Sequence, residues 1–509
     1  MPPNTATPPL SARKRKVKRM NRSIKHLLLV MVSVLTLLSG QAVAQVLSLD
    51  QTIQMALKNN DKIKQYREKF EQAKSADREA LGNFLPSVTL QAGYNHMNDP
   101  LSIDLSPIRD AMMQMQAGNQ VEFSNVYELL QGQPALTSEQ RATLYTEYSS
   151  GLDNILPAFK ETLKDQDYRT ASLVATQPLF MGGKLLAAKK FSAAEKRAAK
   201  VELTSIQNEI IREAVNNYLA IVLLQQTVKT REGVLTGMHQ HRQNAQRLLD
   251  QGLIARYDLL RAEVAVSDAD RNLFDERNNL ELAMVAFRNT LGLDDDTPVT
   301  IYDTLIFHSV SDSLISFREQ AYSSQPILHM ISEKKKAASQ KYAVERSKFL
   351  PQLVGFGKYE LYDNDLSALE PRWIVGVQLS MNIFNGFKDH YRLSAAKSLK
   401  REVNFLEAGA KRQVNLWVNK SYRDMRNAET RYQKLEASVV LAKESVRLND
   451  KRFQTGLGTS LEVIDAQLSL EKNLIERLIS LYNYYKSLTD LLVAAGHPRD
   501  VVTTWNSEE

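Results

Sequence analysis

The chain contains no cysteine among its 509 residues. This absence excludes disulfide frameworks, thiolate metal sites, a cysteine nucleophile and a lipidated N-terminal cysteine. After Gln45 no apolar run reaches 18 residues, so the sequence predicts no transmembrane helix. There is also no glycine-rich phosphate loop, no nucleophile elbow and no His-Glu-x-x-His motif. We therefore expect neither enzymatic activity nor a bound cofactor.

The eight histidines are scattered and show no metal-ligand spacing. His239 and His241 are two positions apart, and side chains at this spacing point away from each other on a helix. The acidic run at residues 294–296 follows a helix stop signal, which is typical of a solvated loop. The sequence therefore predicts no metal site.

The first 44 residues have the pattern of a secretory signal peptide. A basic stretch is followed by an apolar stretch from Leu27 to Leu38, and Ala42-Val43-Ala44 then predicts cleavage before Gln45. A membrane anchor is the alternative, but this stretch of 12 residues is shorter than the ~20 residues that a spanning helix needs. Met20 is an alternative start within this segment.

The positive charge of the chain lies in this segment. Residues 1–44 hold eight lysines and arginines and no acidic residue, so removing eight charges from the net +7 leaves −1. The remaining sequence gives no electrostatic reason to expect nucleic-acid binding.

The rest of the chain is an internal duplication. Matches at an offset of 265 residues are Ala56 with Ala321, Phe84-Leu85-Pro86 with Phe349-Leu350-Pro351, and Tyr94 with Tyr359. Matches at an offset of 204 residues are Leu179-Phe180-Met181-Gly182 with Ile383-Phe384-Asn385-Gly386, Tyr218 with Tyr422, Gly252 with Gly456, Ala262 with Ala466, and Gly292 with Gly496. The difference of 61 residues places an insertion in the first copy, at about residues 99–165.

These offsets predict the domain organisation. The signal peptide (1–44) is followed by a first repeat (45–292), a linker or equatorial segment (293–315), a second repeat (316–498) and a C-terminal tail (499–509). The insertion joins two strands at the end opposite the helices, so we expect it to be extracellular. Within it, residues 138–164 are expected to form a helix.

Each repeat contains two segments with the two-residue period of β-strands, at residues 87–94 and 170–177 and at 353–359 and 373–381. Apolar and polar faces that alternate over about ten residues are typical of a transmembrane β-barrel, although an ordinary half-buried sheet shows the same alternation. Four strands cannot close a barrel, for which about eight is the minimum, and unpaired edges cannot face lipid. The barrel interpretation therefore requires several chains.

Each second strand leads through a glycine turn (Gly182, Gly183 and Gly386) into a helical hairpin. No proline interrupts residues 179–297 or 372–497, which permits very long helices. A helix over residues 184–250 would be roughly 100 Å long and has the 3–4 spacing of coiled coils. Glycines at residues 252 and 456 break each hairpin at its tip, and Gly292 and Gly496 end the second helices.

From Leu47 to about Pro498 the sequence resembles the TolC family of outer-membrane efflux proteins, the outer-membrane factors. The matching segments are Leu47–Thr52 with Ala56-Leu57 and Asn59-Asn60, the turn Gln177–Gly183, and the tips Gly252–Glu263 and Gly456–Gln467. The resemblance implies a mainly α protomer that gives four strands to a trimeric 12-stranded membrane barrel and long coiled-coil helices to a periplasmic α-barrel.

The resemblance also implies a function, namely passive conduction of substrates across the outer membrane within a tripartite efflux or type I export system. The implied partners are two further copies of the chain, outer-membrane lipid, a periplasmic adaptor (membrane fusion) protein and an inner-membrane pump of the RND, ABC or MFS type. The adaptor would contact the tips at Gly252, Leu253, Gly456, Leu457 and Gly458.

The resemblance further implies a periplasmic gate at Glu462 and Asp465, with Asp258 at the matching position of the first repeat. In a trimer, Glu462 and Asp465 would place six carboxylates near one axis, which favours cations. From the spacing alone, the alternative is that these acidic residues cap or solvate the start of a helix.

Two other functions stay open. A secreted or periplasmic coiled-coil protein without a channel would explain the helices and the signal peptide, but not four duplicated strands beside helix junctions. A component devoted to protein secretion would differ from an efflux duct only in its partners. The sequence does not identify the substrate.

Overall fold

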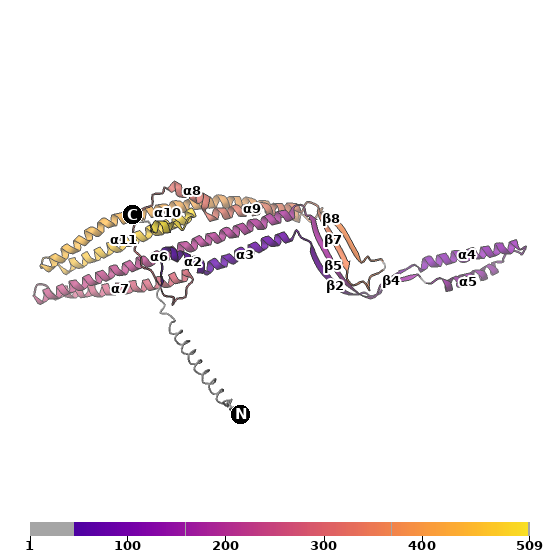
Figure 1. Ribbon diagram of the computed structural model, residues 1–509, viewed down its shortest axis with the longest axis horizontal. Helices are drawn as coiled ribbons and strands as arrows, with labels where there is room; N and C mark the ends of the chain where they lie inside the picture. The colour runs from indigo at the N-terminus through magenta and orange to yellow at the C-terminus, as the bar shows by residue number, and fades with distance from the viewer. Residues whose placement is uncertain (1–44, 158, 368, 507–509) are drawn as a thin grey trace, which may run out of the picture. The chain divides into compact units, whose positions relative to one another are not determined.

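The computed structural model describes residues 45–506 apart from Ala158 and Ala368 (Figure 1). The predicted signal peptide lies outside these residues. The described chain is mainly helical and divides into two compact units. Unit 1 holds the residues up to Gln72, Arg197–Glu333 and those from Asn404 on, and unit 2 holds Ala73–Lys196 and Lys334–Val403. Each unit thus contains residues of both predicted repeats. The long helices of the two repeats each begin in unit 2 and continue into unit 1.

Each repeat contributes a hairpin of two long helices. Helices α6 (Lys184–Asp250) and α10 (Lys388–Gln454) have 67 residues each. Their partners α7 (Arg256–Leu291) and α11 (Ser460–Ala495) have 36 residues each. The predicted helix over 184–250 and the predicted ends at Leu291 and Ala495 are confirmed. Within the described part of the chain, no helix combines the length and apolarity that a membrane span requires.

The hydrophobic core of unit 1 lies between these helices and the predicted linker. It includes residues of α2 (Leu49–Asn59), α8 (Leu314–Ser324), α12 (Asp500–Trp505) and β6 (Val299–Thr300). Strand β6 pairs in parallel with β1 (Gln45–Val46). Tyr218 and Trp505 both donate to Asp303 Oδ2, each over 2.9 Å. Burial and the charge of Asp303 raise the pKa of Tyr218. The segment 293–315 is therefore part of this core.

A buried amide fixes the end of each hairpin. Asn60 Nδ2 donates to Thr290 O at the end of α7, over 3.0 Å. Gln325 Nε2 donates to Val493 O (3.1 Å) and Ala494 O (3.0 Å) at the end of α11. Thr290 O and Ala494 O belong to the last turn of their helices, where carbonyls lack a partner within the helix. Val493 O also accepts a hydrogen bond from Gly496 N (3.1 Å). The same amide–carbonyl hydrogen bond occurs once per repeat. Asn60 corresponds to Gln325 at the offset of 265, and Thr290 corresponds to Ala494 at the offset of 204. Helices α3 (Asp61–Gly82) and α9 (Pro326–Ser347) follow these amide residues.

Unit 2 contains a four-stranded antiparallel sheet in the order β2-β5-β7-β8 (Figure 1). Its strands are β2 (Ser87–His96), β5 (Asp167–Phe180), β7 (Gln352–Glu360) and β8 (Trp373–Ser380). All four predicted strands are confirmed. Strands β2 and β8 are the edges, so each pairs on one side only among the described residues.

The predicted insertion forms a ribbon and a helical hairpin (Figure 1). Strand β3 (Leu101–Asp104) pairs with β4 (Lys160–Lys164), and between them α4 (Ser106–Leu130) packs against α5 (Ser138–Ile155). The predicted helix over 138–164 is wrong beyond Ile155. Leu156 precedes a proline and is extended, because a residue before proline avoids the helical region.

Candidate functional site at the hairpin tips

The two hairpin tips in unit 1 have the same backbone structure. Gly252 and Gly456 have φ values of 73° and 77° and end α6 and α10. The next residues, Leu253 and Leu457, donate their N–H groups to Leu248 O (2.8 Å) and Arg452 O (2.9 Å). This is the glycine-terminated end of a helix, made once per repeat. The Leu253 and Leu457 side chains are exposed at the turns.

Behind the turns, the two hairpins of the chain pack against each other. A buried cluster joins all four helices, with members Ala245, Leu248, Leu259, Ala262, Phe453 and Val463. The tips therefore share one small core, and separating the hairpins at this end would expose it to water.

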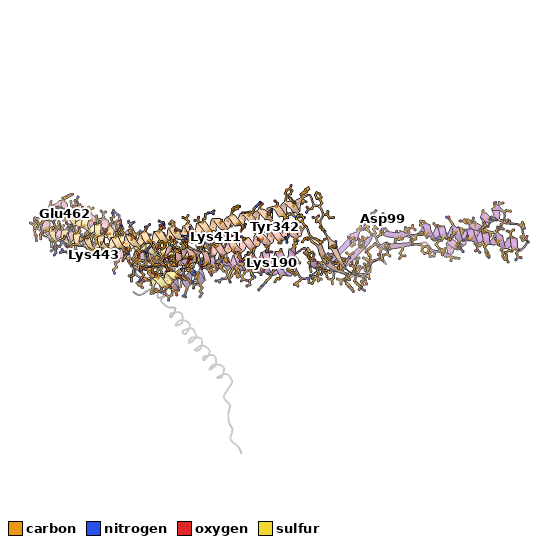
Figure 2. All side chains as sticks on the ribbon, turned by 90° about the horizontal axis from the view of Figure 1, so that it is seen from above. Asp99, Lys190, Tyr342, Lys411, Lys443 and Glu462 are labelled. Atoms are coloured by element: carbon orange, nitrogen blue, oxygen red, sulfur yellow. The ribbon has the colours of Figure 1, made fainter. Side chains whose placement is uncertain are left out.

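The predicted gate residue Glu462 lies at the tip end of α11 (Figure 2). Thr459 N donates to Glu462 Oε2 (3.1 Å), and Glu462 N donates to Thr459 Oγ1 (3.3 Å). This reciprocal pair is a capping box. Arg452 Nη2 lies 3.7 Å from the same carboxylate oxygen. In the single chain, Glu462 thus has the helix-capping role that the sequence left open as the alternative.

The other two predicted gate residues lie nearby in different surroundings. Asp465 is exposed one turn further along α11. Asp258 is half-buried in the first turn of α7, and its backbone oxygen accepts a hydrogen bond from Ser460 Oγ (3.2 Å). The tips therefore bring carboxylates from both repeats together, but in unequal settings.

His241 links the two hairpins at this site. Its Nε2 lies 2.8 Å from Ser460 Oγ, and its ring centroid lies 4.7 Å from that of Phe453. When the Ser460 hydroxyl donates to Asp258 O, its oxygen accepts from His241, which then carries its proton on Nε2. Nδ1 is then a buried acceptor without a hydrogen-bond partner among the described residues. From the sequence, His241 stood out only as a neighbour of His239 in a spacing that does not suit a metal site, so this contact was not predicted.

The His241 link should weaken in acid. Burial lowers the pKa of this imidazole to about 4, and the charge of Asp258 opposes the shift only in part. The folded value lies below the unfolded value of ~6.5, so the stabilisation is complete above pH 6.5 and is lost as pH falls toward 4. We expect the tips to lose about 2 kcal/mol of local stability between pH 7 and pH 5.

Hydrogen exchange of the tip peptides, corrected for intrinsic rates, measures this loss. His241→Phe keeps the ring contact and should remove most of the pH dependence. His239→Phe is the matched control, since His239 is exposed and its replacement should leave the pH dependence unchanged. Equal pH dependence in wild type and His241→Phe would contradict the assignment.

Arg231 makes a second link between the hairpins. Its Nη1 lies 2.5 Å from Glu471 Oε1 on α11, and its Nε lies 3.2 Å from Glu276 Oε2 on α7. Glu471 is buried, and burial raises the pKa of its carboxyl although Arg231 acts in the opposite direction. The sequence did not indicate this contact, because 240 residues separate Arg231 from Glu471.

In unit 2, the predicted glycine turns lie where β5 and β8 lead into α6 and α10. Gly182 has a φ of 60°, and a Cβ there would lie 2.8 Å from both Leu350 Cβ and Ser347 O. Gly183 follows with a φ of 82°. In the second repeat, Gly386 is followed by Phe387, which has a φ of 62°. Such a φ strains a bulky side chain, so the second turn is strained where the first is relaxed.

Exposed aromatic side chains gather at both ends of the sheet. At the end that meets the helices are Phe84, Phe180, Phe349, Phe384 and Phe387. At the opposite end are Tyr94, Tyr359 and Trp373. Two aromatic rows separated by the length of a strand are typical of sheets that cross a membrane. The strained Phe387 belongs to the first of these rows.

Long duplicated hairpins and a four-stranded sheet are the elements expected of an outer-membrane channel protomer. The fold resembles VceC of Vibrio cholerae with a TM-score of 0.67 and 16% identity, covering 88% of this chain and 96% of that chain. It resembles the CmeC outer membrane channel of Campylobacter jejuni with a TM-score of 0.67 and 14% identity, covering 90% of each chain.

The chain belongs to the outer membrane efflux protein family, whose model matches residues 52–293 and 318–497. Outer membrane protein TolC of Vibrio cholerae is 22% identical over 185 residues, which are 36% of this chain and 42% of that protein. The aligned part therefore spans less than half of this relative.

Family membership confirms the expected class, an outer membrane efflux protein, and the expected location in the outer membrane. It favours this class over a periplasmic coiled-coil protein without a channel. The structural likenesses, at 16% identity or less, show the fold alone.

Proposed function

We propose that this chain is the outer-membrane duct of a tripartite efflux or type I export system and conducts substrates passively. The observation that carries this proposal is the sheet of unit 2. Among the described residues, each of its edge strands pairs on one side only. Its large apolar side chains are exposed, among them Val88, Leu90, Val375, Val377 and Leu379. Such a sheet needs additional strands at its edges and an apolar surrounding on one face.

Three chains satisfy both needs. Twelve strands close a barrel when β8 of one chain pairs with β2 of the next, which leaves no edge exposed to lipid. The alternating apolar face then lies toward lipid, with the two aromatic rows at the membrane interfaces. In this trimer, the repeats 45–292 and 316–498, joined by segment 293–315, contribute the helices of a periplasmic α-barrel.

The duct requires partners at its tips. The sequence has no phosphate-binding loop, so the energy for transport comes from an inner-membrane pump, of the RND, ABC or MFS type. A periplasmic adaptor connects the two by docking on the tips, where Leu253 and Leu457 present exposed apolar side chains. A photo-crosslinking residue at Leu457 in living cells should capture this adaptor.

Conduction is the direct test. The purified protein should form ion-conducting pores in planar lipid bilayers and should be recovered from cells in the outer-membrane fraction. Recovery as a soluble periplasmic monomer, together with the absence of conductance, would contradict the proposal.

The proposed gate consists of Glu462, Asp465 and Asp258 around the axis of the trimer. Glu462→Ala removes a charge and the half of the capping box in which Glu462 Oε2 accepts from Thr459 N, while the backbone N–H of residue 462 still donates to Thr459 Oγ1. Glu462→Gln keeps the cap, since glutamine is equally suited to this position. Pairing each of these two substitutions with a change at Asp465 separates the effect of lost negative charge from the effect of a less stable start of α11.

In planar bilayers, Glu462→Gln with Asp465→Asn should lower the preference for cations while changing the conductance little. Glu462→Ala with Asp465→Ala should also raise the single-channel conductance, because it removes side-chain volume and loosens the start of α11. If both pairs kept the selectivity and conductance of the wild type, these residues would not form the constriction.

A further inference from the structure

Helix α4 of the insertion has two apolar faces. Met113, Ala117, Val121 and Asn125 are buried on one of them, toward α5. On the opposite face, six large apolar side chains are 50% to 82% exposed, and we call them the outer stripe: Ile108, Met112, Met115, Phe123, Val126 and Leu130. Helix α5 has no such stripe, since its exposed side carries residues such as Glu139, Gln140, Thr143 and Glu147. The hairpin therefore has one polar and one apolar side.

The hairpin cannot bury the outer stripe by rotating α4, because polar contacts fix the two helices in place. Arg109 forms an ion pair with Asp153 at one end of the hairpin. Arg141 Nη1 lies 2.6 Å from Glu122 Oε1, and Ser124 Oγ lies 3.0 Å from Tyr148 Oη. At the other end, Leu136 N donates to Asn125 Oδ1 over 3.0 Å.

From Ile108 to Leu130 the outer stripe and Asn119 follow steps of 4, 3, 4, 4, 3 and 4 residues, so Ile108, Asn119 and Leu130 are 11 residues apart. An 11-residue repeat is a coiled-coil repeat that gives a right-handed supercoil. Asn119 is exposed and lies in the middle of the stripe. A single asparagine at a core position of a coiled coil fixes the register and the number of helices, at a cost in stability. The stripe is therefore suited to other helices that carry the same pattern.

Charge disfavours a lipid surface as the occupant. Residues 105–156 contain two arginines and six carboxylates, and both arginines are in ion pairs. Helices that lie on membranes are usually rich in lysine and arginine, which bind anionic lipid headgroups. The outer stripe itself contains no charged residue.

We propose that the outer stripe binds the outer stripes of the neighbouring copies, so that three α4 helices form a parallel coiled coil. This inference rests on the proposed trimer, because a threefold axis places identical helices in parallel and in the same register. The coiled coil lies beyond the β3–β4 ribbon, on the side of the barrel away from the periplasmic helices, and narrows the outer mouth of the duct.

The absence of cysteine from the chain allows a test with single introduced thiols. Val126→Cys lies on the outer stripe, and Thr143→Cys, on the exposed side of α5, is the matched control. Full-length variants in outer-membrane vesicles are treated with a short bis-maleimide. We expect roughly tenfold more crosslinked dimer from Val126→Cys, because a shared axis holds the thiols at the effective concentration of tethered groups.

A second variant tests the stripe itself. Adding Met112→Glu and Met115→Glu to Val126→Cys should reduce crosslinking to the level of Thr143→Cys, while the contacts between α4 and α5 lie on the other face and stay intact. Crosslinking that survives both charges would overturn the proposal.

Light scattering of the detergent-solubilised protein separates the two hypotheses. A trimeric mass without enriched Val126→Cys crosslinking would overturn the coiled coil and leave the duct intact. A monomeric mass would overturn the trimer, and with it the proposed barrel. Protection of Val126→Cys from maleimide labelling without crosslinking would indicate a different occupant and would also overturn the coiled coil.

Discussion

Replacing Val377 with arginine should prevent most of the protein from assembling in the outer membrane, whereas replacing Gln378 should not. The two residues are neighbours in β8 and lie on opposite faces of the strand. Val377 shares its face with Trp373, Val375 and Leu379, which are all exposed in the single chain. In the proposed barrel this face meets lipid, where an arginine near the midplane costs about 2–4 kcal/mol per strand.

Three copies multiply this cost, so a trimer with Val377→Arg is destabilised by roughly 6–12 kcal/mol. Gln378→Arg would place its charge in the lumen, where it changes ion selectivity. Quantitative immunoblots of heat-resistant oligomer in the membrane fraction measure assembly, and bilayer recordings measure selectivity. Equal assembly of the two variants would show that the apolar face of β8 does not meet lipid.

The regular elements were predictable because their patterns are local. The four strands have a two-residue period, and proline-free stretches bounded by Gly182 and Gly252 or by Gly386 and Gly456 define the long helices. Helix α4 was not predicted. Its apolar residues occupy two opposite faces, so the sequence lacks the single stripe by which an amphipathic helix is recognised.

The candidate site was predictable only in part. The tips follow from two glycines, and the capping box of Glu462 is a contact over three residues that the sequence signalled as an alternative. His241 and Arg231 contact partners that are 219 and 240 residues away in the sequence. No periodicity in the sequence predicts contacts over such separations. The proposed gate needs the other two copies of the proposed trimer, so a single chain cannot display it.

Removing Arg231 should have the second large effect, because it leaves two carboxylates without their partner between the hairpins. Breaking a buried ion pair by removing one member destabilises a protein by about 3–5 kcal/mol. We expect Arg231→Met to raise hydrogen exchange where α6, α7 and α11 meet and to lower the temperature at which the hairpins separate. Arg277→Met is the control, since the Arg277–Glu232 pair is exposed (58% and 46%) and contributes about 1 kcal/mol or less.

Two further measurements would separate lost charge pairing from lost packing. Combining Arg231→Met with Glu471→Leu and Glu276→Leu should restore most of the stability, because replacing a whole buried ion network with apolar residues is often neutral. The cost of Arg231→Met should also be smaller at pH 5 than at pH 7. The pKa of Glu471 is already raised by burial, and without Arg231 it rises further, so this carboxyl gains a proton in the folded state as pH falls. His241 acts in the opposite direction, so the comparison is made in the His241→Phe background. A cost that did not change with pH would assign the effect of Arg231 to the packing of its aliphatic chain.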